Sequence, residues 1–592
     1  MLDTKFGNGG IATAPGIALL LVGSALTLLA LLGLAALIGL VGLLDAPGIG
    51  GSEGGQDLSL PALPAPPRAT PRDPWTPLSA GLRHLARTRP GSSAKVLGRM
   101  YEEKSFRPFW VTPDSLSDGG ESLLLHLAGP GREAWRSDEH RLTEIGHLHH
   151  LAFPEPLEAD AHAIAELEWV LSESFMRYAT GLLEGRAPWA RAWEDWHLAE
   201  RSPSIKRIVG KLDEWGAPRT LKFLLRSHER YTSLRKALLE YRSIERAGGW
   251  QSIEAGASLE RGDRSKRVGE LRRRLAVTGD LKAAGDAPVF DAELEPAVRK
   301  FQQRHGLNAD GRVGSKTLEA LNVPVEERIR QLEINLERCR WLPASLGEEF
   351  IWVNVPEFRL RAYRSEREVL SMPVVVGAPE SPTPSFREEI DYAVLNPYWY
   401  VPESIAVNEL MPKAHKDPGF LMRANYELLD EGGSLVASDK LRKDLLLSGH
   451  HRIRRKPGPR NDLGRIKFML PNRFRIYLHD TPARHLFERT SRAFSHGCIR
   501  VGQPLDLAKY LFADRFRELE SGLDTGEEKV LHLREPVPVY IVYFTAWRSD
   551  DGTVNFRNDI YGRDGELALQ LSGATPSERP DLALQLLWPH FG

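Results

Sequence analysis

The sequence predicts a multidomain α+β protein: an N-terminal transmembrane helix, a helical scaffold domain, a small three-helix domain, and a mostly β domain with an inserted capping subdomain. Three observations support this fold class. An uncharged stretch lies near the N-terminus, apolar residues recur every three or four positions from about 81 to 262, and runs of β-branched and aromatic residues begin at about 349. A chain of 592 residues is long enough for several domains.

The composition indicates a globular protein that does not bind nucleic acid. Hydrophobic residues make up 42% and charged residues 27%, which is typical of folded rather than disordered chains. Lys and Arg total 78 against 79 Asp and Glu, so no basic surplus is available for a polyanion. Only two cysteines are present, which argues against a disulfide framework, and Cys339 is expected to be a small buried hydrophobe.

Residues 16–44 carry no charge. At about 1.5 Å per residue, a helix of this length exceeds the roughly 30 Å hydrocarbon core of a membrane. A cleaved signal peptide is the alternative, but its apolar region usually has about 7–15 residues and ends in a small-residue site. We therefore interpret residues 1–45 as an uncleaved signal anchor in the cytoplasmic (inner) membrane. The bulk of the chain would then be periplasmic or otherwise extracytoplasmic.

The next segments are assigned from their residue patterns. Residues 46–80 are rich in Gly and Pro without apolar periodicity, which indicates a linker. Residues 81–262 show helical periodicity, as in ELEWVLSESFMRYATGLLEGR, and predict the scaffold domain. Residues 263–325 contain two helical stretches and the turn-rich NADGRVGSKTLEALN, which predicts three short helices.

After a connector at 326–348, strand patterns such as FIWVNV, VLSMPVVVG and FRIYLH predict a mostly β domain over 349–562. Residues 563–592 are assigned to a C-terminal tail. Between about 401 and 460 the strands give way to a polar, helix-prone insertion that ends in the basic run HHRIRRKPGPR. Insertions of this length are often functional, so we expect a cap.

The residues that suggest catalysis lie within the β domain. Cys498, in the sequence SHGCIR, comes nineteen positions after His479, which ends the predicted strand FRIYLH. A thiol becomes a good nucleophile when an imidazole or a positive field favours its thiolate. Gly497 permits backbone geometry that would direct nearby amides at a developing oxyanion.

Two other interpretations fit the same spacing. Zinc could be bound by His479, His496 and Cys498, but a structural site needs a fourth ligand and no second cysteine lies nearby. A buried, inert cysteine with incidental histidines fits the spacing as well as catalysis does.

A family resemblance favours catalysis. The segment GPRNDLGRIKFMLPNRFRIYLHDTPARHLFERTSRAFSHGCIRV (458–501) resembles the active-site signature of the L,D-transpeptidase family, with its YkuD-type catalytic domain. It is similar in particular to the large membrane-anchored, YcbB-like branch. The stretch AVRKFQQRHGLNADGRVGSKTLEALN resembles a peptidoglycan-binding module. The resemblance runs from about 97 to 562, with one departure at Cys339, where tryptophan would be expected.

The resemblance implies that Cys498 is the nucleophile and His479 the general base, and it makes Ser495, His496, Gly497 and Arg500 supporting residues of the oxyanion loop. Arg500 could hold a donor carboxylate or buttress the loop, and both roles stay open. His496 is interpreted as an organiser of the loop. We expect the insertion to close over an acidic peptide, with a substrate groove lined by Asn396, Trp399, Tyr400 and Tyr477.

The implied function is L,D-transpeptidation, in which a cysteine thioester intermediate leads to 3-3 cross-links between peptidoglycan stems. The partners would be a tetrapeptide donor stem, a second stem as acceptor, the membrane and other wall-synthesis enzymes. No metal and no organic cofactor is implied. An essential thiol should be inactivated by carbapenem-type β-lactams. The alternatives are an L,D-carboxypeptidase or wall-trimming cysteine hydrolase, and a noncatalytic peptidoglycan-binding protein.

Overall fold

The computed structural model describes residues 75–128, 141–154, 159–185, 196–198, 205–225, 229–282, 285, 287–343 and 345–571. The predicted transmembrane helix and most of the predicted linker lie outside these residues, as does the end of the predicted tail. Among the residues that are described, no helix is both long and apolar enough to cross a bilayer.

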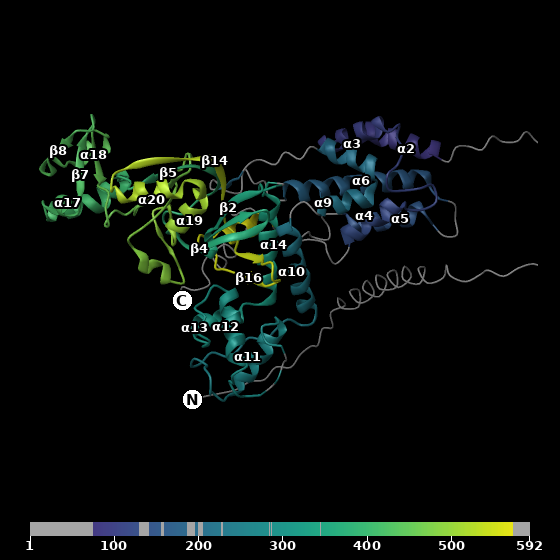
Figure 1. Ribbon diagram of the computed structural model, residues 1–592. Helices are drawn as coiled ribbons and strands as arrows, with labels where there is room; N and C mark the ends of the chain where they lie inside the picture. The colour runs from purple at the N-terminus through teal and green to yellow at the C-terminus, as the bar shows by residue number, and fades with distance from the viewer. Residues whose placement is uncertain are drawn as a thin grey trace, which may run out of the picture. The chain divides into compact units, whose positions relative to one another are not determined.

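The N-terminal part of the described chain is a bundle of helices (Figure 1). Its helices are α2 (Trp75–Thr88), α3 (Ser92–Glu103), α4 (Asp118–Ala128), α5 (Leu142–Ala152), α6 (Ala161–Glu184), α8 (Ile205–Trp215) and α9 (Ala217–Leu225). Helix α10 (Glu229–Arg246) follows and packs against α14 (Val325–Arg340) (Figure 1). The prediction of a helical scaffold is therefore confirmed. Helix α2 starts inside the range predicted as linker, because Leu78, Leu82 and Leu85 are spaced for one helix face and are buried there.

The buried carboxylate of Glu168 on α6 connects the bundle to the loop before α4. It accepts hydrogen bonds from the amides of Phe109, Trp110 and Val111 at 2.7, 2.9 and 3.1 Å. The hydroxyl of Tyr101 donates to the same carboxylate at 2.6 Å. Four donors thus compensate for the cost of burying this charge.

The three-helix domain is also confirmed. Its helices are α11 (Lys266–Val277), α12 (Leu294–Arg304) and α13 (Ser315–Asn322), and Leu271, Leu275 and Phe301 lie in its own core. The predicted connector is largely one helix, α14 (Val325–Arg340), which packs against α10. Cys339 on α14 is a buried free thiol, as expected from the sequence.

The mostly β domain is confirmed and is built on one sheet. Its main strands are β2 (Glu349–Asn354), β3 (Arg359–Arg364), β4 (Arg367–Gly377), β5 (Ser385–Leu395), β10 (Ile466–Met469), β11 (Leu478–His479), β13 (Ile499–Val501) and β14 (Lys529–Val542). They follow the order β5-β10-β11-β13-β4-β3-β2-β14, and β14 also pairs with β5. The sheet therefore closes on itself, as in a barrel.

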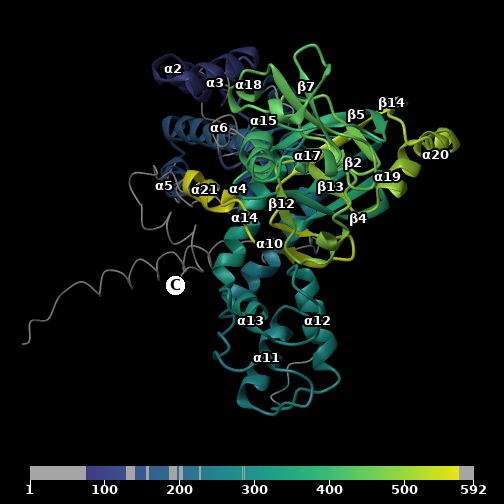
Figure 2. The ribbon, with the colours of Figure 1, turned by 90° about the vertical axis from the view of Figure 1, so that its left-hand side faces the viewer.

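Smaller elements complete this domain (Figure 2). They are β1 (Trp196–His197), β12 (Ala493–Ser495), α19 (Pro504–Leu511), α20 (Phe516–Asp524), β15 (Ala546–Arg548), β16 (Val554–Phe556) and α21 (Arg563–Leu571). Strand β1 belongs to the scaffold sequence but pairs in parallel with β5. Helix α21 occupies the first nine residues of the predicted tail and contacts α14.

The insertion contains more strand than its sequence suggested. A four-stranded sheet runs in the order β6-β9-β7-β8, with β6 at Trp399–Tyr400, β7 at Tyr426–Asp430, β8 at Leu435–Val436 and β9 at His451–Arg455. Short helices surround it: α15 (Glu403–Ile405), the π-helix η2 (Ala406–Leu410), α16 (Met411–Lys416), α17 (Phe420–Arg423) and α18 (Lys443–Leu447). Strand β9 is hard to recognise because arginines alternate with its single buried residue, Ile453.

Candidate active site

Strands β11 and β13 bring His479 and Cys498 to the same region of the sheet. The two strands are parallel neighbours, with Leu478 opposite Ile499 and His479 opposite Arg500. Leu478 and Ile499 are both fully buried. Because side chains alternate along a strand, His479 and Arg500 face the opposite side, as do the flanking residues Tyr477 and Cys498. One face of this ladder therefore carries a thiol, an imidazole, a phenol and a guanidinium.

The imidazole of His479 is only 4% exposed, and its tautomer follows from one hydrogen bond. Its Nδ1 lies 2.5 Å from the carbonyl oxygen of Asp480. A carbonyl can only accept, so Nδ1 carries the proton and Nε2 is left as a base. Burial, together with the charges of Arg500 and Lys467, lowers the pKa of His479 to about 3.

The carboxylate of Asp480 fixes the segment around His479. It accepts hydrogen bonds from the amides of Thr481 and Arg465 at 2.7 and 2.8 Å, and it forms an ion pair with Arg484. Its own amide donates to the Ile466 carbonyl. The imidazole of His479 is thus held through its strand and through the adjacent Asp480.

Cys498 is a partly buried free thiol. Burial raises its pKa above the ordinary value, while contacts with Tyr477 and the charges of Lys467 and Arg500 offset part of that rise. Its sulfur lies 3.8 Å from the carbonyl oxygen of Arg475, to which a thiol can donate. At neutral pH the site therefore holds a neutral thiol and a neutral imidazole.

Sequence reasoning did not identify Lys467, which belongs to the same face. It pairs with His479 across β10 and β11, and its Nζ lies 3.7 Å from the centroid of the Tyr477 ring. The signal was present in strand β10, IKFM, where Lys467 is a charged residue between the fully buried Ile466 and Phe468. The strand register was needed to place that charge opposite the base.

Ser495 and Gly497 shape the loop that presents the thiol. The Ser495 hydroxyl donates to the Cys498 carbonyl at 2.5 Å and accepts from the Gly497 amide at 3.1 Å. Gly497 has a φ of +112°, and a Cβ there would lie 3.0 Å from Ile476. Both observations favour glycine at this position. Because the Gly497 amide already donates to the Ser495 hydroxyl, it cannot donate to an oxyanion in this conformation.

The amide of Cys498 is differently placed. The next amide, of Ile499, donates to the Tyr477 carbonyl at 3.1 Å. No acceptor among the described residues takes a hydrogen bond from the Cys498 amide. The same holds for the His496 amide, so the loop has two amides that donate to no described residue.

The hydroxyls of the buried Thr383 and the half-buried Tyr561 support the same loop. The Thr383 hydroxyl donates to the Gly497 carbonyl at 2.7 Å and accepts from the Gly377 amide at 2.9 Å. The Tyr561 hydroxyl donates to the Gly377 carbonyl at 2.6 Å and accepts from the Thr383 amide at 3.3 Å. These contacts make the loop conformation depend on residues more than a hundred positions earlier and some sixty later in the chain.

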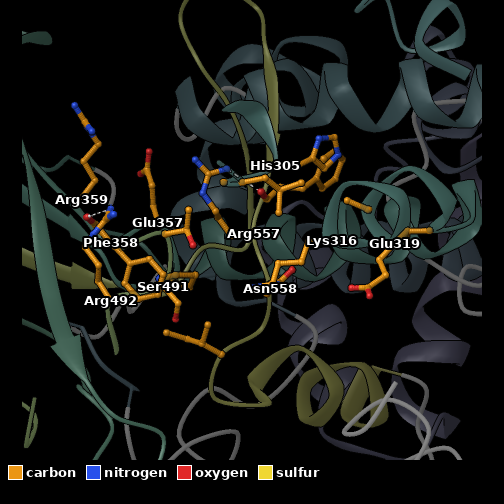
Figure 3. A pocket seen from close by; sticks show the side chains of 18 of the residues that line it. His305, Lys316, Glu319, Glu357, Phe358, Arg359, Ser491, Arg492, Arg557 and Asn558 are labelled. Atoms are coloured by element: carbon orange, nitrogen blue, oxygen red, sulfur yellow. Dashed lines mark hydrogen bonds between the residues drawn. The ribbon is translucent and has the colours of Figure 1, made fainter. Parts of the chain in front are cut away.

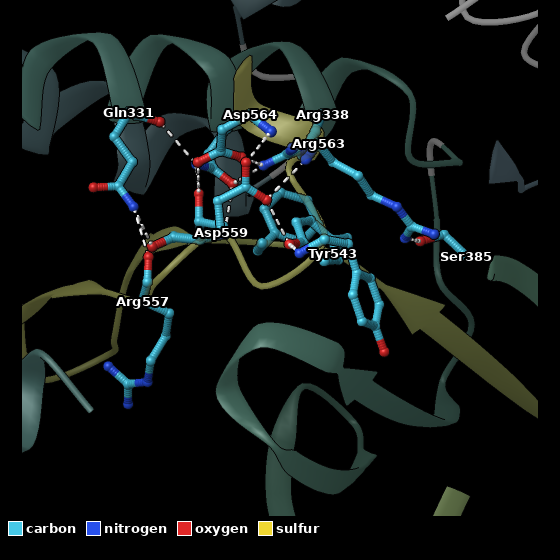
Figure 4. A network of polar contacts seen from close by, with 12 residues as sticks. Gln331, Arg338, Ser385, Tyr543, Arg557, Asp559, Arg563 and Asp564 are labelled. Atoms are coloured by element: carbon cyan, nitrogen blue, oxygen red, sulfur yellow. Dashed lines mark hydrogen bonds and ion pairs between the residues drawn. The ribbon is translucent and has the colours of Figure 1, made fainter. Parts of the chain in front are cut away.

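A polar network extends from Tyr561 to helix α14 (Figure 4). The Tyr543 hydroxyl accepts from the Tyr561 amide at 2.9 Å and donates to Asp559 at 2.5 Å. Asp564 lies close by and forms a buried ion pair with Arg338 at 2.6 Å. The connector helix and the segment that holds the nucleophile loop are thereby linked through side chains.

The remaining predicted residues have contacts elsewhere. The Asn396 amide donates to the carbonyls of Gly522 and Leu523, each at 3.1 Å, so this buried residue holds backbone together. Trp399 and Tyr400 form β6 within the insertion, where the Trp399 ring lies 6.4 Å from that of Tyr426. Of the four predicted groove residues, Tyr477 is the one in contact with Cys498.

His496 connects the nucleophile loop to the insertion. Its exposed side chain places Nε2 2.8 Å from Oε1 of Glu409, which lies on η2. The imidazole therefore faces the cap, and His479 occupies a separate strand. This arrangement agrees with the interpretation of His496 as a residue that organises the loop.

Comparison with protein families identifies three segments. Residues 348–530 match the L,D-transpeptidase catalytic domain, residues 95–238 match a scaffold domain, and residues 264–321 match a putative peptidoglycan binding domain. The catalytic match contains β2 to β13, and with them His479 and Cys498.

Two individual proteins are similar to part of this chain. A putative L,D-transpeptidase of Haemophilus influenzae is 33% identical over 244 residues, covering 40% of this chain and 49% of the relative. The N-acetylmuramoyl-L-alanine amidase CwlM of Mycobacterium tuberculosis is 43% identical over 77 residues, covering 12% of this chain and 19% of the relative. The chain thus spans about half of the first relative and a fifth of the second.

Solved structures of lower similarity include two L,D-transpeptidases. One, from Stackebrandtia nassauensis, is 13% identical with a TM-score of 0.21 and covers 49% of this chain and 96% of its own. The other, from Xylanimonas cellulosilytica, is 14% identical with a TM-score of 0.17 and covers 49% and 99% respectively.

Proposed function

The chain contains a catalytic domain of the L,D-transpeptidase family beside a peptidoglycan-binding domain, and from this premise we propose that it forms 3-3 cross-links in peptidoglycan. The observation that carries the proposal is the shared strand face, on which an Nε2 base and a thiol lie in neighbouring positions. Nucleophilic acyl transfer needs these two groups together.

The first half-reaction transfers the donor stem to the enzyme. Nε2 of His479 accepts the proton of the Cys498 thiol as Sγ attacks the carbonyl of the L-centre in the third residue of the stem. The tetrahedral oxyanion receives a hydrogen bond from the Cys498 amide. The bond to the terminal D-residue then breaks, the imidazolium protonates the leaving amine, and a thioester remains on Sγ.

The second half-reaction consumes that thioester. The side-chain amine of a second stem attacks the thioester carbonyl while His479 accepts its proton. Collapse expels the thiolate, which regains the proton from the imidazolium. The donor carbonyl is then joined to the acceptor through an amide, and the enzyme returns to its starting protonation state.

Lys467 and Arg500 support this chemistry electrostatically. Their charges lie near Sγ and lower the free energy of the thiolate that forms during attack. The same charges disfavour a protonated His479 in the resting enzyme, which keeps the base available. Arg500 can also bind a carboxylate of the donor stem, because its guanidinium lies on the same face as Cys498 and His479.

The test is incubation of the purified chain with tetrapeptide-bearing muropeptides, followed by mass spectrometry, beside a Cys498→Ala control. Dimers with a 3-3 linkage that are absent from the control support the proposal. Tripeptide monomers without dimers would replace it with hydrolysis. Unchanged muropeptides in both samples, together with retained wall binding, would replace it with a noncatalytic role.

We further propose that residues 16–44 anchor the chain in the cytoplasmic membrane, with its catalytic part outside. The length of the uncharged run supports this. Fractionation of cells that express the whole chain, beside a chain without residues 1–45, tests the anchor. Loss of the membrane-bound fraction is expected on deletion, and cleavage by external protease in spheroplasts should require no detergent. A soluble full-length chain would contradict the anchor.

A further inference from the structure

A cavity of about 690 Å³ lies between the three-helix domain and the β domain (Figure 3). Residues at the end of α12 and on α13, including His305 and Lys316, form one wall. The opposite wall comes from the turn before β3 and from the segment that precedes β12, including Arg492. A volume of this size is typical of ligand sites.

Positive charge predominates among the side chains that line the cavity. Six are cationic and three are acidic: Lys316, Arg328, Arg359, Arg361, Arg492 and Arg557 against Glu319, Glu357 and Glu368. Arg361 binds both oxygens of Glu357 at 2.6 Å and also contacts Glu368 at 2.9 Å. One arginine thus accounts for two of the three acids.

The other four arginines contact neutral acceptors. Arg492 donates to the carbonyls of Phe358 and Val374 at 3.1 and 3.2 Å, and the Arg359 Nε donates to the Ser371 hydroxyl at 2.6 Å. Arg557 likewise donates to backbone carbonyls. Within the described part of the chain, none of these four forms an ion pair, although the charge of Glu357 acts to raise the pKa of Arg492 and of Arg557.

Arg328 also lines the cavity and has a buried donor without an acceptor in the described part of the chain. It is only 8% exposed, and its Nε has no hydrogen-bond acceptor among the described residues. Burial and the neighbouring Arg304 lower the pKa of Arg328 to about 10, and burial with Arg359 and Arg557 does the same for Arg492. An anion in the cavity would offset the repulsion among these arginines and could accept a hydrogen bond from the Arg328 Nε.

The cavity also lies against the segment that leads to the nucleophile. The Arg492 carbonyl accepts from the Val376 amide at 2.9 Å, and β12 follows directly and ends at Ser495. A ligand bound to Arg492 would therefore contact the start of the strand that carries the loop of Cys498. Both walls belong to domains matched to peptidoglycan enzymes and binding modules.

We propose that this cavity binds a carboxylate-bearing stem peptide of peptidoglycan, separate from the donor stem at Cys498. The inference rests on the proposed function, which supplies the wall as substrate. Guanidinium groups hold carboxylates through paired hydrogen bonds, and several of them around one cavity suit a ligand with more than one carboxylate. The peptide would be covalently attached to a glycan chain bound by the three-helix domain. Binding of the peptide in the cavity would therefore keep that glycan chain beside the catalytic domain.

Carbodiimide cross-linking of the whole chain, carrying Cys498→Ala to prevent turnover, tests the proposal. The carbodiimide adds to a stem carboxyl group to give an O-acylisourea, whose carbonyl carbon is attacked by the Lys316 Nζ; an amide forms and a urea leaves. Peptide mass spectrometry locates the cross-linked lysine. Lys316 should be labelled at least about fivefold more than the exposed Lys266 of the same domain. Labelling of Lys467 reports separately on the donor site, so failure of the proposed function is distinguishable from failure of the cavity.

Two comparisons sharpen the result. Arg359→Gln should lower Lys316 labelling severalfold and leave Lys467 labelling unchanged, whereas Arg367→Gln, an exposed change on β4 outside the cavity, should lower neither. Unlabelled acidic stem peptide should compete, and the same peptide with amidated carboxyls should not. Labelling of Lys316 equal to that of Lys266, or equal protection by amidated peptide or by inorganic phosphate, would overturn the proposal.

Discussion

At the scale of single residues, the chemistry depends on how the sheet sets the protonation of His479 and Cys498. The imidazole is buried beside Lys467 and Arg500, which opposes a positive charge on it. The thiol is also desolvated, which opposes a negative charge. The proton is therefore expected to move during attack, when both charges form together and stabilise each other.

This arrangement predicts an unusual pH profile. The pKa of His479 is about 3 and that of Cys498 is raised above the ordinary value. At pH values between these two, the imidazole and the thiol both stay neutral. Lowering the pH should protonate the base, and stop the reaction, only near pH 3. Acylation by a carbapenem-type β-lactam should thus have a kcat/KM that is nearly flat from about pH 5 to 8. An inflection near 6.5, the ordinary value for histidine, would contradict the account.

Lys467→Met should slow acylation of Cys498 about tenfold, which corresponds to about 1.4 kcal/mol in the barrier. The variant removes a positive charge that favours the thiolate, while the methionine chain preserves packing against Tyr477. Stopped-flow β-lactam acylation measures the rate, and the exposed Lys95→Met serves as the matched control. Equal acylation rates for the two variants would show that Lys467 does not promote acylation of Cys498.

At the scale of elements, the nucleophile loop is held by side chains from distant parts of the chain. The Thr383 hydroxyl connects the Gly377 amide to the Gly497 carbonyl, and the Tyr561 hydroxyl donates to the Gly377 carbonyl. A loop with such support can hold Sγ in one position through both half-reactions. Preorganisation of this kind depends on buried hydrogen bonds that have no alternative partners.

Thr383→Val should destabilise the protein by about 1–3 kcal/mol, because it leaves a buried amide and a buried carbonyl without their partner. It should also slow acylation, since Gly497 would lose its anchor. Urea unfolding and β-lactam acylation measure the two effects. Thr383→Ser keeps the hydroxyl and should retain most of the rate. A Thr383→Val enzyme that acylates at the wild-type rate would show that the loop needs no such support.

Sequence patterns predicted those parts of the site that lie within continuous motifs. Residue types and the strand that ends at His479 suggested Cys498 and His479, and the family resemblance decided for catalysis and added the loop residue Ser495. Lys467 and Thr383 could not be found in this way, because their roles arise only from strand register and from contacts across more than a hundred residues. Asn396 was assigned to a groove, but its amide is committed to backbone carbonyls after the chain folds.

The same distinction applies to the fold. The scaffold, the three-helix domain and the β domain were predicted correctly because each shows a long, consistent periodicity. The sheet of the insertion was missed because its strands are short and carry charges that pair across the sheet, such as Arg454 with Glu427 at 2.7 Å. The start of α2 was placed late because Pro77 resembles linker sequence but is tolerated in the first turn of a helix.

At the scale of the whole molecule, helix α14 joins the parts of the described chain. It packs on α10 of the scaffold, and its Gln331 and Asn335 bond to the backbone and side chain of the C-terminal segment. Arg338 adds a buried ion pair to Asp564 at the start of α21. The connector is therefore a structural part of the catalytic domain rather than a spacer.

Arg338→Met should destabilise the protein by about 3–5 kcal/mol, since it leaves Asp564 buried without its partner. Burial already raises the pKa of Asp564 to about 6, so folded protein holds a proton that unfolded chain releases, and stability falls as pH rises through that range. Without Arg338 this loss should extend to higher pH. Denaturant unfolding at pH 5 and pH 8 measures it, and adding Asp564→Asn should recover much of the stability. Equal stability of wild type and variant at both values would contradict the role of the pair.

The most direct test of the central claim is intact-mass measurement of the enzyme after rapid mixing with a tetrapeptide donor in the absence of an acceptor. The account predicts an adduct with the mass of the tripeptide acyl group on Cys498, with release of one terminal D-residue for each adduct. The buried Cys339 should remain unmodified and serves as the internal control. Turnover of the donor without an adduct on Cys498 would contradict a thioester mechanism at this residue. Turnover of the donor by the Cys498→Ala variant would contradict it as well.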